Sequence, residues 1–164
     1  MAGHDLKLWQ ETMDTNLTSA LLTMSIFLPA MLEAGWGRVI NISSISGQTA
    51  EAHGSAYSAS KFAMIGLSQA AALETANRGV TVNAVCPGWV KTDLSVTQIE
   101  SPEWRDLTGM PGTAEDSMDF TLLSVPQERF IEVEEVADLV TYLAGESARG
   151  ITGQAINICG GLSI

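Results

Sequence analysis

The sequence has few positive charges and few cysteines, and both scarcities narrow the range of functions. Eight Lys and Arg residues stand against nineteen Asp and Glu residues, which gives a formal net charge of −11. Such an acidic protein is a poor candidate for binding nucleic acid or an anionic membrane, because both carry negative charge. Cys86 and Cys159 lie in apolar runs without metal-ligand spacing. This favours buried, reduced thiols in a cytoplasmic protein and predicts no metal site.

Long uninterrupted apolar runs are also absent. The opening MAGHDLKLWQ has no basic segment followed by an apolar core, so it does not resemble a signal peptide. The most apolar stretch, residues 20–34, includes a proline, a glutamate and several hydroxyl residues. We expect it to be too short and too polar to span a bilayer. With 164 residues, 46% of them hydrophobic, the chain is expected to form one domain over residues 1–164.

Hydrophobic periodicity predicts alternating helices and strands. Apolar residues that recur every three or four positions are typical of helices, and short β-branched runs are typical of buried strands. The predicted order is helix 6–34, strand 38–43, helix 56–77, strand 80–85, two short helices within a variable segment 94–130, helix 133–144 and strand 154–158. Strands separated by helices predict an α/β fold with about three parallel strands and flanking helices.

Polar residues follow the carboxyl ends of the first two predicted strands. Ser44 follows the first strand, and the loop CPGWVKT, which includes Thr92, follows the second. Tyr57 and Lys61 lie four residues apart near the start of the intervening helix, so they share one helix face. Because the carboxyl ends of parallel strands meet at one sheet edge, we expect these four side chains to converge.

A tyrosine beside a lysine is able to exchange protons with a substrate. The phenol has a pKa of about 10 in water, and a cation one helical turn away should lower that pKa. A nearby serine hydroxyl can stabilise a developing oxyanion. These groups suit proton delivery to a carbonyl while a cofactor delivers hydride. The spacing alone also fits an ordinary surface pair.

Four motifs together resemble the short-chain dehydrogenase/reductase family: NISS at 41–44, YSASK at 57–61, VNAVCPGWVKT at 82–92 and ITGQAINICGG at 151–161. They look most like the 3-oxoacyl and aromatic-polyketide ketoreductases. The resemblance implies the C-terminal part of a Rossmann-type doubly wound parallel sheet. It also implies an oxidoreductase that uses NAD or NADP to interconvert a ketone and a secondary alcohol, with a 3-oxoacyl-like or polyketide-like substrate.

The resemblance implies a role for each matching residue. Tyr57 is similar to the catalytic acid/base, Lys61 to the residue that lowers its pKa and holds the nicotinamide ribose, and Ser44 to the substrate-orienting serine. Asn16, in DTNLTSA, is similar to the asparagine that holds a water of the proton relay. Plainer interpretations stay open: Asn16 could pair helices, and Ser44 could form a turn.

The loop after the second strand is similar to the family's nicotinamide-binding loop. The implied cofactor contacts, besides Tyr57 and Lys61, come from Pro87, Gly88, Val90 and Thr92. Pro87 and Gly88 could instead simply end the strand, and Thr92 could cap the helix that begins near Asp93.

The variable segment 94–130 is expected to form a substrate lid. Within it, Trp104, Met110, Met118 and Phe120 suggest an apolar portion of the substrate. His53 could face substrate or only solvent, and Trp89 and Trp104 could line a pocket or simply pack. CPGWVKTDL followed by Gln98 also resembles hydroxybutyrate dehydrogenases. That subfamily ranks lower, because neither Ser46 nor Gly54 supplies the basic or imidazole group it would need.

The family's nucleotide-binding features are missing from the sequence. No Gly-rich turn follows an opening strand, and the G-x-G at residues 35–37 precedes a strand instead. We therefore expect either the catalytic half of a longer enzyme or a natural remnant. The alternative function is a catalytically inactive module for oligomerisation or interaction. The resemblance implies a homodimer or homotetramer formed through the helices at 6–34 and 56–77.

Overall fold

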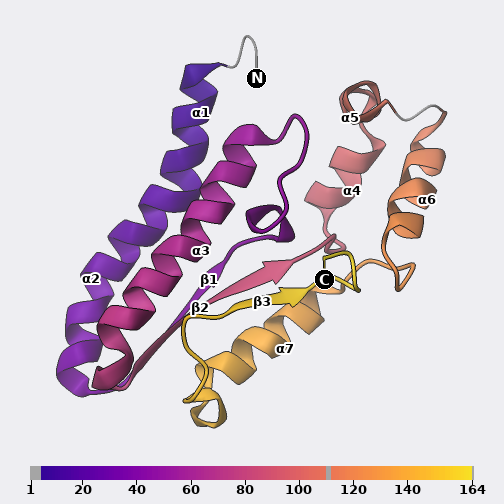
Figure 1. Cartoon of the computed structure of the whole chain (residues 1–164). Helices are drawn as coiled ribbons and strands as arrows, with labels where there is room; N and C mark the ends of the chain where they lie inside the picture. Colours follow the sequence, from indigo (N-terminus) through magenta and orange to yellow (C-terminus); the bar gives the residue numbers. More distant parts are fainter. Residues whose placement is uncertain (1–4, 110–111, 164) are drawn as a thin grey trace.

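A parallel sheet of three strands organises the protein. The computed structural model describes residues 5–109 and 112–163, and its strands lie in the order β1 (Gly37–Ile42), β2 (Val80–Pro87) and β3 (Ala155–Ile158) (Figure 1). Val39 of β1 pairs with Val82 of β2, and Val85 of β2 pairs with Ile156 of β3. The predicted parallel α/β fold is confirmed, and each strand lies within two residues of its predicted bounds.

Helices connect and cover the strands. They are α1 (Leu6–Met13), the π-helical turn η1 (Asp14–Thr18), α2 (Ser19–Ala34), α3 (Ser55–Thr75), α4 (Asp93–Glu100), α5 (Pro102–Thr108), α6 (Ala114–Ser124) and α7 (Val133–Ala144), with 3-10 turns η2 (Ile45–Gly47), η3 (Ala76–Arg78) and η4 (Glu146–Ala148). In Figure 1, α1, α2 and α3 lie on one side of the sheet and α7 on the other.

The segment 94–130 contains the two predicted short helices, as α5 and α6, and most of a third helix, α4, which begins at Asp93. The additional helix, α4, starts where the Thr92 hydroxyl accepts the backbone N–H of Ser95 at 3.2 Å. Ile99 anchors it, because that side chain is 0% exposed. The sequence indicated this helix only through Thr92, as a possible cap near Asp93.

The N-terminal helix is continuous from Leu6 to Ala34, as predicted, but it contains the π-helical turn η1. By length and composition it could cross a membrane: it has 29 residues, and its most apolar 18-residue window has a mean hydropathy of 1.5 and is 6% buried. Residues 20–34, which we expected to be too short to span a bilayer, make up only about half of this helix. A single such helix is weak support for a membrane span, because helices that pack against protein have the same composition.

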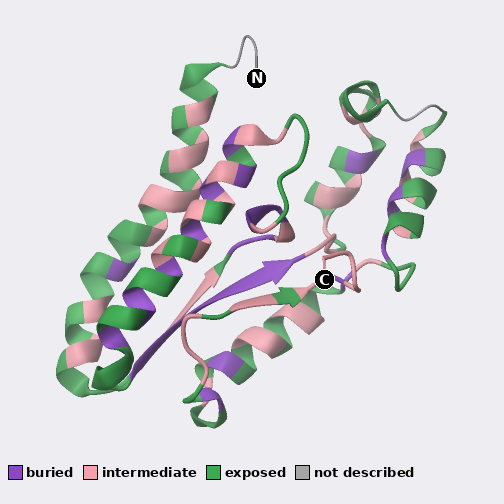
Figure 2. Ribbon diagram, viewed as in Figure 1, coloured by how far each residue is buried: buried purple, intermediate pink, exposed green. Residues whose placement is uncertain are grey.

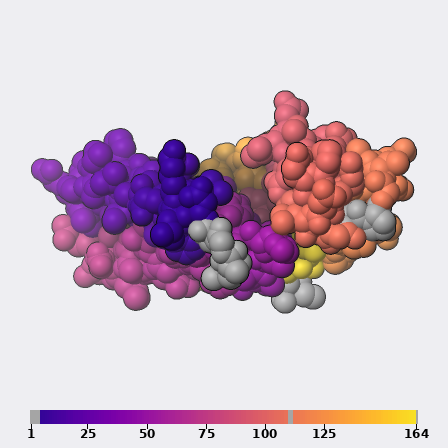
Figure 3. Space-filling view, turned by 90° about the horizontal axis from the view of Figure 1, so that it is seen from above, coloured from indigo at the N-terminus to yellow at the C-terminus, as the bar shows by residue number. Residues whose placement is uncertain are grey.

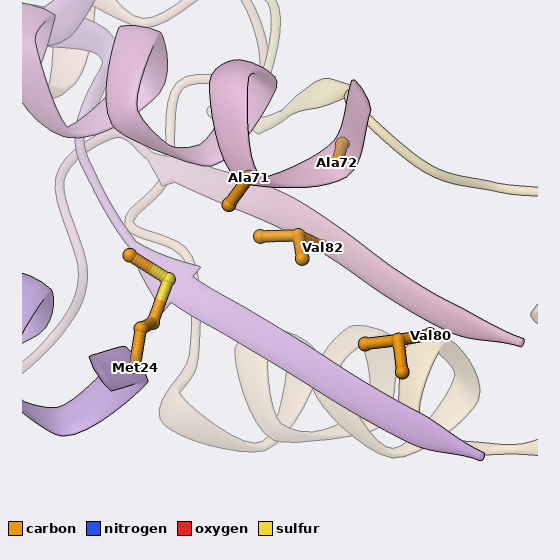
Figure 4. Close-up of a cluster of buried hydrophobic side chains, with 5 residues drawn as sticks. All are labelled: Met24, Ala71, Ala72, Val80 and Val82. Carbon is orange, nitrogen blue, oxygen red and sulfur yellow. The ribbon is translucent and has the colours of Figure 1, made fainter. Parts of the chain in front are cut away.

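Strand β2 is buried on both faces and forms the centre of the core (Figure 2). Val80 and Val82 point towards the α2–α3 layer, where they pack with Met24, Ala71 and Ala72 (Figure 4). Val85 has the opposite parity and packs on the α7 side with Leu143 and Ala148. Side chains alternate across a strand, so β2 serves both layers and the sheet is doubly wound.

A close approach of two backbones closes the end of the sheet away from the carboxyl ends of the strands. Gly79, between η3 and β2, has φ 76°, and a Cβ atom there would lie 2.1 Å from the carbonyl oxygen of Gly35. Only glycine fits this position without moving the backbone. This contact holds the end of α2 against the turn that leads into β2.

Candidate active site

A tight turn after β1 places Ser44 beside α3. The Ser44 hydroxyl accepts the backbone N–H of Ser46 at 3.1 Å and so caps η2. The Ser43 hydroxyl donates to the carbonyl of Lys61 at 2.9 Å, which ties the turn to α3. A Cβ atom on Gly47 would lie 2.8 Å from that same carbonyl, so the turn can approach α3 this closely only with glycine here.

Tyr57 and Lys61 lie in the first two turns of α3 and face the same edge. The Tyr57 side chain lies close enough to that of Ser44 for the Ser44 hydroxyl to influence its pKa, and the residue is 40% exposed. The ammonium of Lys61 lies 5.6 Å from the centre of the Tyr57 ring. It donates to the carbonyl of Ile42, the last residue of β1, at 2.8 Å. Of the four side chains predicted to converge, those of Ser44, Tyr57 and Lys61 therefore meet at this edge, whereas Thr92 caps α4 and is outside the lining of the cavity described below.

The electrostatics of the pair differ from the sequence-based expectation. Burial raises the pKa of Tyr57 above 10.0; the Ser44 hydroxyl lowers it, and the charge of Glu51 raises it further. Burial also lowers the pKa of Lys61 below 10.5. The ammonium is directed at a backbone carbonyl and lies over the ring face. The phenol is therefore protonated near neutral pH and can act as a proton donor.

Asn16 connects the N-terminal helix to α3 within the same region. It lies in η1, and its side-chain amide donates to the Ser60 hydroxyl at 3.0 Å. Ser60 is fully buried and donates to the carbonyl of Tyr57 at 2.7 Å. The helix-pairing interpretation of Asn16 is thus confirmed by its contact, and its role in holding a water stays a prediction.

The loop after β2 is fixed at several points. The backbone N–H of Gly88 donates to the carbonyl of Ile158 at 3.0 Å, which holds the loop against β3. Val90 forms a parallel bridge with Ile131, the residue two positions before α7. The capping interpretation of Thr92 is confirmed, because its hydroxyl begins α4. The cofactor contacts implied for this loop stay predictions.

A cavity of about 460 Å³ opens between the η2–α3 region and helices α4 and α5. Figure 3 shows α4–α6 as a lobe beside the N-terminal helices, with a recess between them. Three predicted site residues line the cavity: Ser44, Tyr57 and Gly88. Asn16, Lys61, Pro87, Val90 and Thr92 are outside its lining.

The lining of the cavity combines polar and apolar side chains. The polar side chains are Ser44, Ser46, Glu51, His53, Tyr57, Ser95 and Gln98, and the larger apolar ones are Ile45, Trp89, Leu94, Trp104 and Leu107. The rings of Trp89 and Trp104 meet edge to face, with centres 5.9 Å apart. This arrangement fits a ligand with an oxygen-bearing end near Tyr57 and an apolar body against the tryptophans.

Sequence reasoning identified only part of the lining of the cavity. Ser46 and Glu51 were not predicted as site residues, although an acidic residue in a loop of small residues was a usable signal. Trp104 does line the cavity, whereas Met118 and Phe120 of α6 do not. Met110 lies outside the described residues.

Both cysteines are free and buried. Cys86, at the end of β2, has its pKa raised by burial, although contacts with Ser44, Ser43 and Lys61 oppose that shift. Such a thiol is a poor nucleophile. Within residues 5–109 and 112–163, no group of three or more His, Cys, Asp or Glu side chains could hold a metal ion.

The chain is similar to several known proteins. Residues 1–163 match the profile of a family described as "Enoyl-(Acyl carrier protein) reductase". The chain is 42% identical over 154 residues to a D-beta-hydroxybutyrate dehydrogenase of Rhizobium meliloti, a match that covers 93% of this chain and 58% of the relative. It is 34% identical over 154 residues to a 3-oxoacyl-(acyl-carrier-protein) reductase of Staphylococcus epidermidis, covering 94% of this chain and 57% of the relative.

The backbone of this chain also matches that of a solved structure. A crystal structure of a variant actinorhodin polyketide ketoreductase with NADPH superposes with a TM-score of 0.91 at 39% identity, and the match covers 98% of this chain and 61% of that one. The chain spans between 57% and 60% of the length of the curated relatives it matches.

Proposed function

This chain belongs to the short-chain dehydrogenase/reductase family, and from that premise we propose that it carries the catalytic residues of an NAD(P)-dependent oxidoreductase. The reaction would interconvert a ketone and a secondary alcohol. The observation that carries the proposal is the meeting of Ser44, Tyr57 and Lys61 at one edge of the sheet, beside a cavity of about 460 Å³.

Tyr57 is proposed as the acid/base and Ser44 as the group that orients the substrate oxygen. A carbonyl oxygen placed between the two hydroxyls would accept hydrogen bonds from both, and the phenol would supply the proton. The raised pKa of Tyr57 keeps the phenol protonated at neutral pH but also makes it a weaker acid, so donation would depend on groups that stabilise the phenolate as it forms. In the reverse direction, the phenolate oxygen of Tyr57 would have to take a proton from the alcohol.

The residues present fit the nicotinamide end of a dinucleotide. Lys61 has three N–H donors, and its hydrogen bond to Ile42 leaves others for the hydroxyls of a ribose. Gly88, Val90 and Thr92 belong to a loop anchored on β3 and at Ile131, so it would present a fixed surface to the ring. Bound NAD(P)H would supply the hydride. Within the described residues, no strand is joined to a following helix by a glycine-rich turn, which is the arrangement that would hold the pyrophosphate.

The substrate is proposed to be a 3-oxoacyl-like or polyketide-like carbonyl compound, or the corresponding alcohol. The apolar part of the lining, with Trp89 and Trp104, supports an extended or ring-bearing body. Relatives named as a 3-oxoacyl-(acyl-carrier-protein) reductase and an actinorhodin polyketide ketoreductase support the same class.

The test compares ketone-dependent NADPH oxidation by the wild-type protein and by Tyr57→Phe. We expect a loss of at least about 100-fold in turnover, the usual scale for removing a general acid. Folding should be retained, because Tyr57 is 40% exposed and its hydroxyl supports no core contact. Turnover within a few-fold of wild type, with an unchanged unfolding midpoint, would refute the role of Tyr57.

An oligomer through the long helices is proposed as well. Large apolar side chains are exposed on α2 and α3: Leu21, Leu22, Ile26, Phe27, Phe62 and Leu73. Burying this surface in a partner copy would be favourable. Light scattering during size-exclusion chromatography tests the proposal, and Ile26→Glu should shift the mass towards the monomer.

Free, buried thiols and the acidic charge support a cytoplasmic location.

A catalytically inactive interaction module is the second candidate. It is favoured by the edge of β1, which pairs only with β2 within the described residues, and by the exposed face of α2. Titration of NADPH fluorescence on the purified protein separates the candidates. Micromolar binding supports the oxidoreductase, and no binding up to millimolar concentration supports the module.

A further inference from the structure

We propose that Glu51 determines substrate specificity, by excluding anionic substrates and selecting neutral ones with a hydrogen-bond donor close to the reacting carbon. The inference rests on the proposed function, since it concerns the same cavity. It adds a chemical class of substrate and a residue that neither the resemblance nor the comparisons assign.

Three hydrogen bonds hold Glu51 in place. Its carboxylate oxygen Oε1 accepts the hydroxyl of Ser46 at 2.5 Å, and Ser46 is only 2% exposed. The backbone N–H of Glu51 donates to the Ser58 hydroxyl at 3.3 Å, and its carbonyl accepts the N–H of Gly54 at 3.3 Å. These bonds hold the carboxylate at a part of the cavity lining that is open to solvent, since Glu51 is exposed.

A chain of hydroxyl groups joins Glu51 to the proposed acid. The Ser44 hydroxyl donates to that of Ser46 at 3.2 Å, and it lies close enough to the Tyr57 side chain to influence the pKa of the phenol. A substrate oxygen held by Ser44 and Tyr57 places its neighbouring carbon atoms near Glu51. A carboxylate has about four acceptor positions, and the Ser46 hydroxyl occupies one of them. The others can accept a substrate hydroxyl or amide N–H.

No cation in the cavity wall offsets the charge of Glu51. Among the described residues that line the cavity, Glu51 is the one carboxylate, His53 is the one histidine, and neither Lys nor Arg is present. The ammonium of Lys61 is outside the lining and is directed at Ile42. An anionic group beside the reacting carbon would thus meet a like charge without a partner.

The expected substrates follow from this wall. A 3-oxoamide or a hydroxylated ketone presents a donor to Glu51 and an apolar body to Trp89 and Trp104. A free 3-oxo or 3-hydroxy acid presents a carboxylate at the same place and should be rejected. This expected preference for neutral substrates distinguishes the chain from the D-beta-hydroxybutyrate dehydrogenase to which it is 42% identical. The substrate named for that relative is an acid.

The test measures binding of three stable probes with one carbon skeleton: 3-hydroxyoctanamide, methyl 3-hydroxyoctanoate and 3-hydroxyoctanoate. Quenching of tryptophan fluorescence reports occupancy, because Trp89 and Trp104 line the cavity. Wild type, Glu51→Gln and Glu51→Lys are compared. Glu74→Gln is the matched control, since it removes the same charge from an exposed position near the far end of α3. Circular dichroism checks the fold of each variant.

We expect wild type and Glu74→Gln to bind the amide at least about tenfold more tightly than the carboxylate, which corresponds to about 1.4 kcal/mol. The ratio should fall below about threefold in Glu51→Gln and should invert in Glu51→Lys. The inference is overturned if wild type does not discriminate, if none of the probes binds, or if both Glu51 variants keep the wild-type ratio. Binding requires no proton transfer, so the turnover of Tyr57→Phe tests the proposed function separately.

Discussion

The side chain of Asn83 holds the segment before β3 against the central strand β2, so replacing Asn83 should lower the free energy of unfolding. It lies in β2 and is 1% exposed. Its side-chain N–H donates to the carbonyl of Ile151 at 2.7 Å, and its side-chain oxygen accepts the backbone N–H of Gln154 at 3.1 Å. Asn83→Ala leaves both backbone groups without their partner. Each unsatisfied buried group costs about 1–3 kcal/mol. We expect a loss of about 3 kcal/mol in the free energy of unfolding, because both groups lie near the surface and water can replace part of the interaction.

Urea unfolding followed by circular dichroism measures this loss from the midpoint, provided that the slope m stays constant. Asn157→Ala is the matched control, because Asn157 lies on the neighbouring strand but is exposed and makes one hydrogen bond, to the carbonyl of Ser163 at 3.0 Å. Its cost should stay below about 1 kcal/mol. Equal losses of unfolding free energy in the two variants, or a loss below about 1 kcal/mol in Asn83→Ala, would refute this role of the Asn83 side chain.

Three further measurements test the packing and the charges. Val82 is 0% exposed, so Val82→Ala should cost about 2–3 kcal/mol in urea unfolding, from two lost methyl groups and the cavity they leave; a loss below about 1 kcal/mol would contradict this packing. The hydrogen bond from Arg129 lowers the pKa of Glu135 from 4.5 to about 2, so the stability difference between wild type and Glu135→Gln should be full above pH 4.5 and vanish as the pH falls towards 2. A constant difference over that range would argue against the ion pair. Because the pKa of Tyr57 is raised above 10.0, its contribution to stability is present below pH 10.0 and is lost as the pH rises beyond it. Tyr57→Phe should therefore flatten the alkaline decline in unfolding midpoint, and an unchanged decline would count against the raised pKa.

The sequence predicted the sheet well because its strands are short β-branched runs bounded by glycine and proline. Helix α7 was predicted with the right bounds, 133–144, since its apolar stripe is strong and its ends carry clear signals. The meeting of Ser44, Tyr57 and Lys61 followed from topology alone, because the carboxyl ends of parallel strands share one edge. These are properties that a pattern of residue types determines.

Other features depend on distances that no local pattern contains. The direction of the pKa shift of Tyr57 depends on its burial and on Glu51, whereas the sequence suggested only the neighbouring Lys61. The bond between Ser46 and Glu51 depends on how the loop between β1 and α3 folds back. The π-helical turn around Asn16 lacks a distinctive residue pattern, since it differs from an α-helix only in its hydrogen-bond register.

That π-helical turn sets the place of Asn16 rather than the phase of the N-terminal helix. Residues 14–18 form a wider turn, so deleting one residue there would let the helix close as ordinary α-helix. A π-turn closes its hydrogen bond over one residue more than an α-turn does, so the halves on either side of the deletion would keep nearly the same phase, and Met24 would keep its packing on β2. The deletion would instead remove the wide turn that carries Asn16, and with it the geometry of the hydrogen bond from Asn16 to Ser60. A one-residue gap at this place in an alignment would therefore leave the core face of the helix in register and change the contact beside the proposed site.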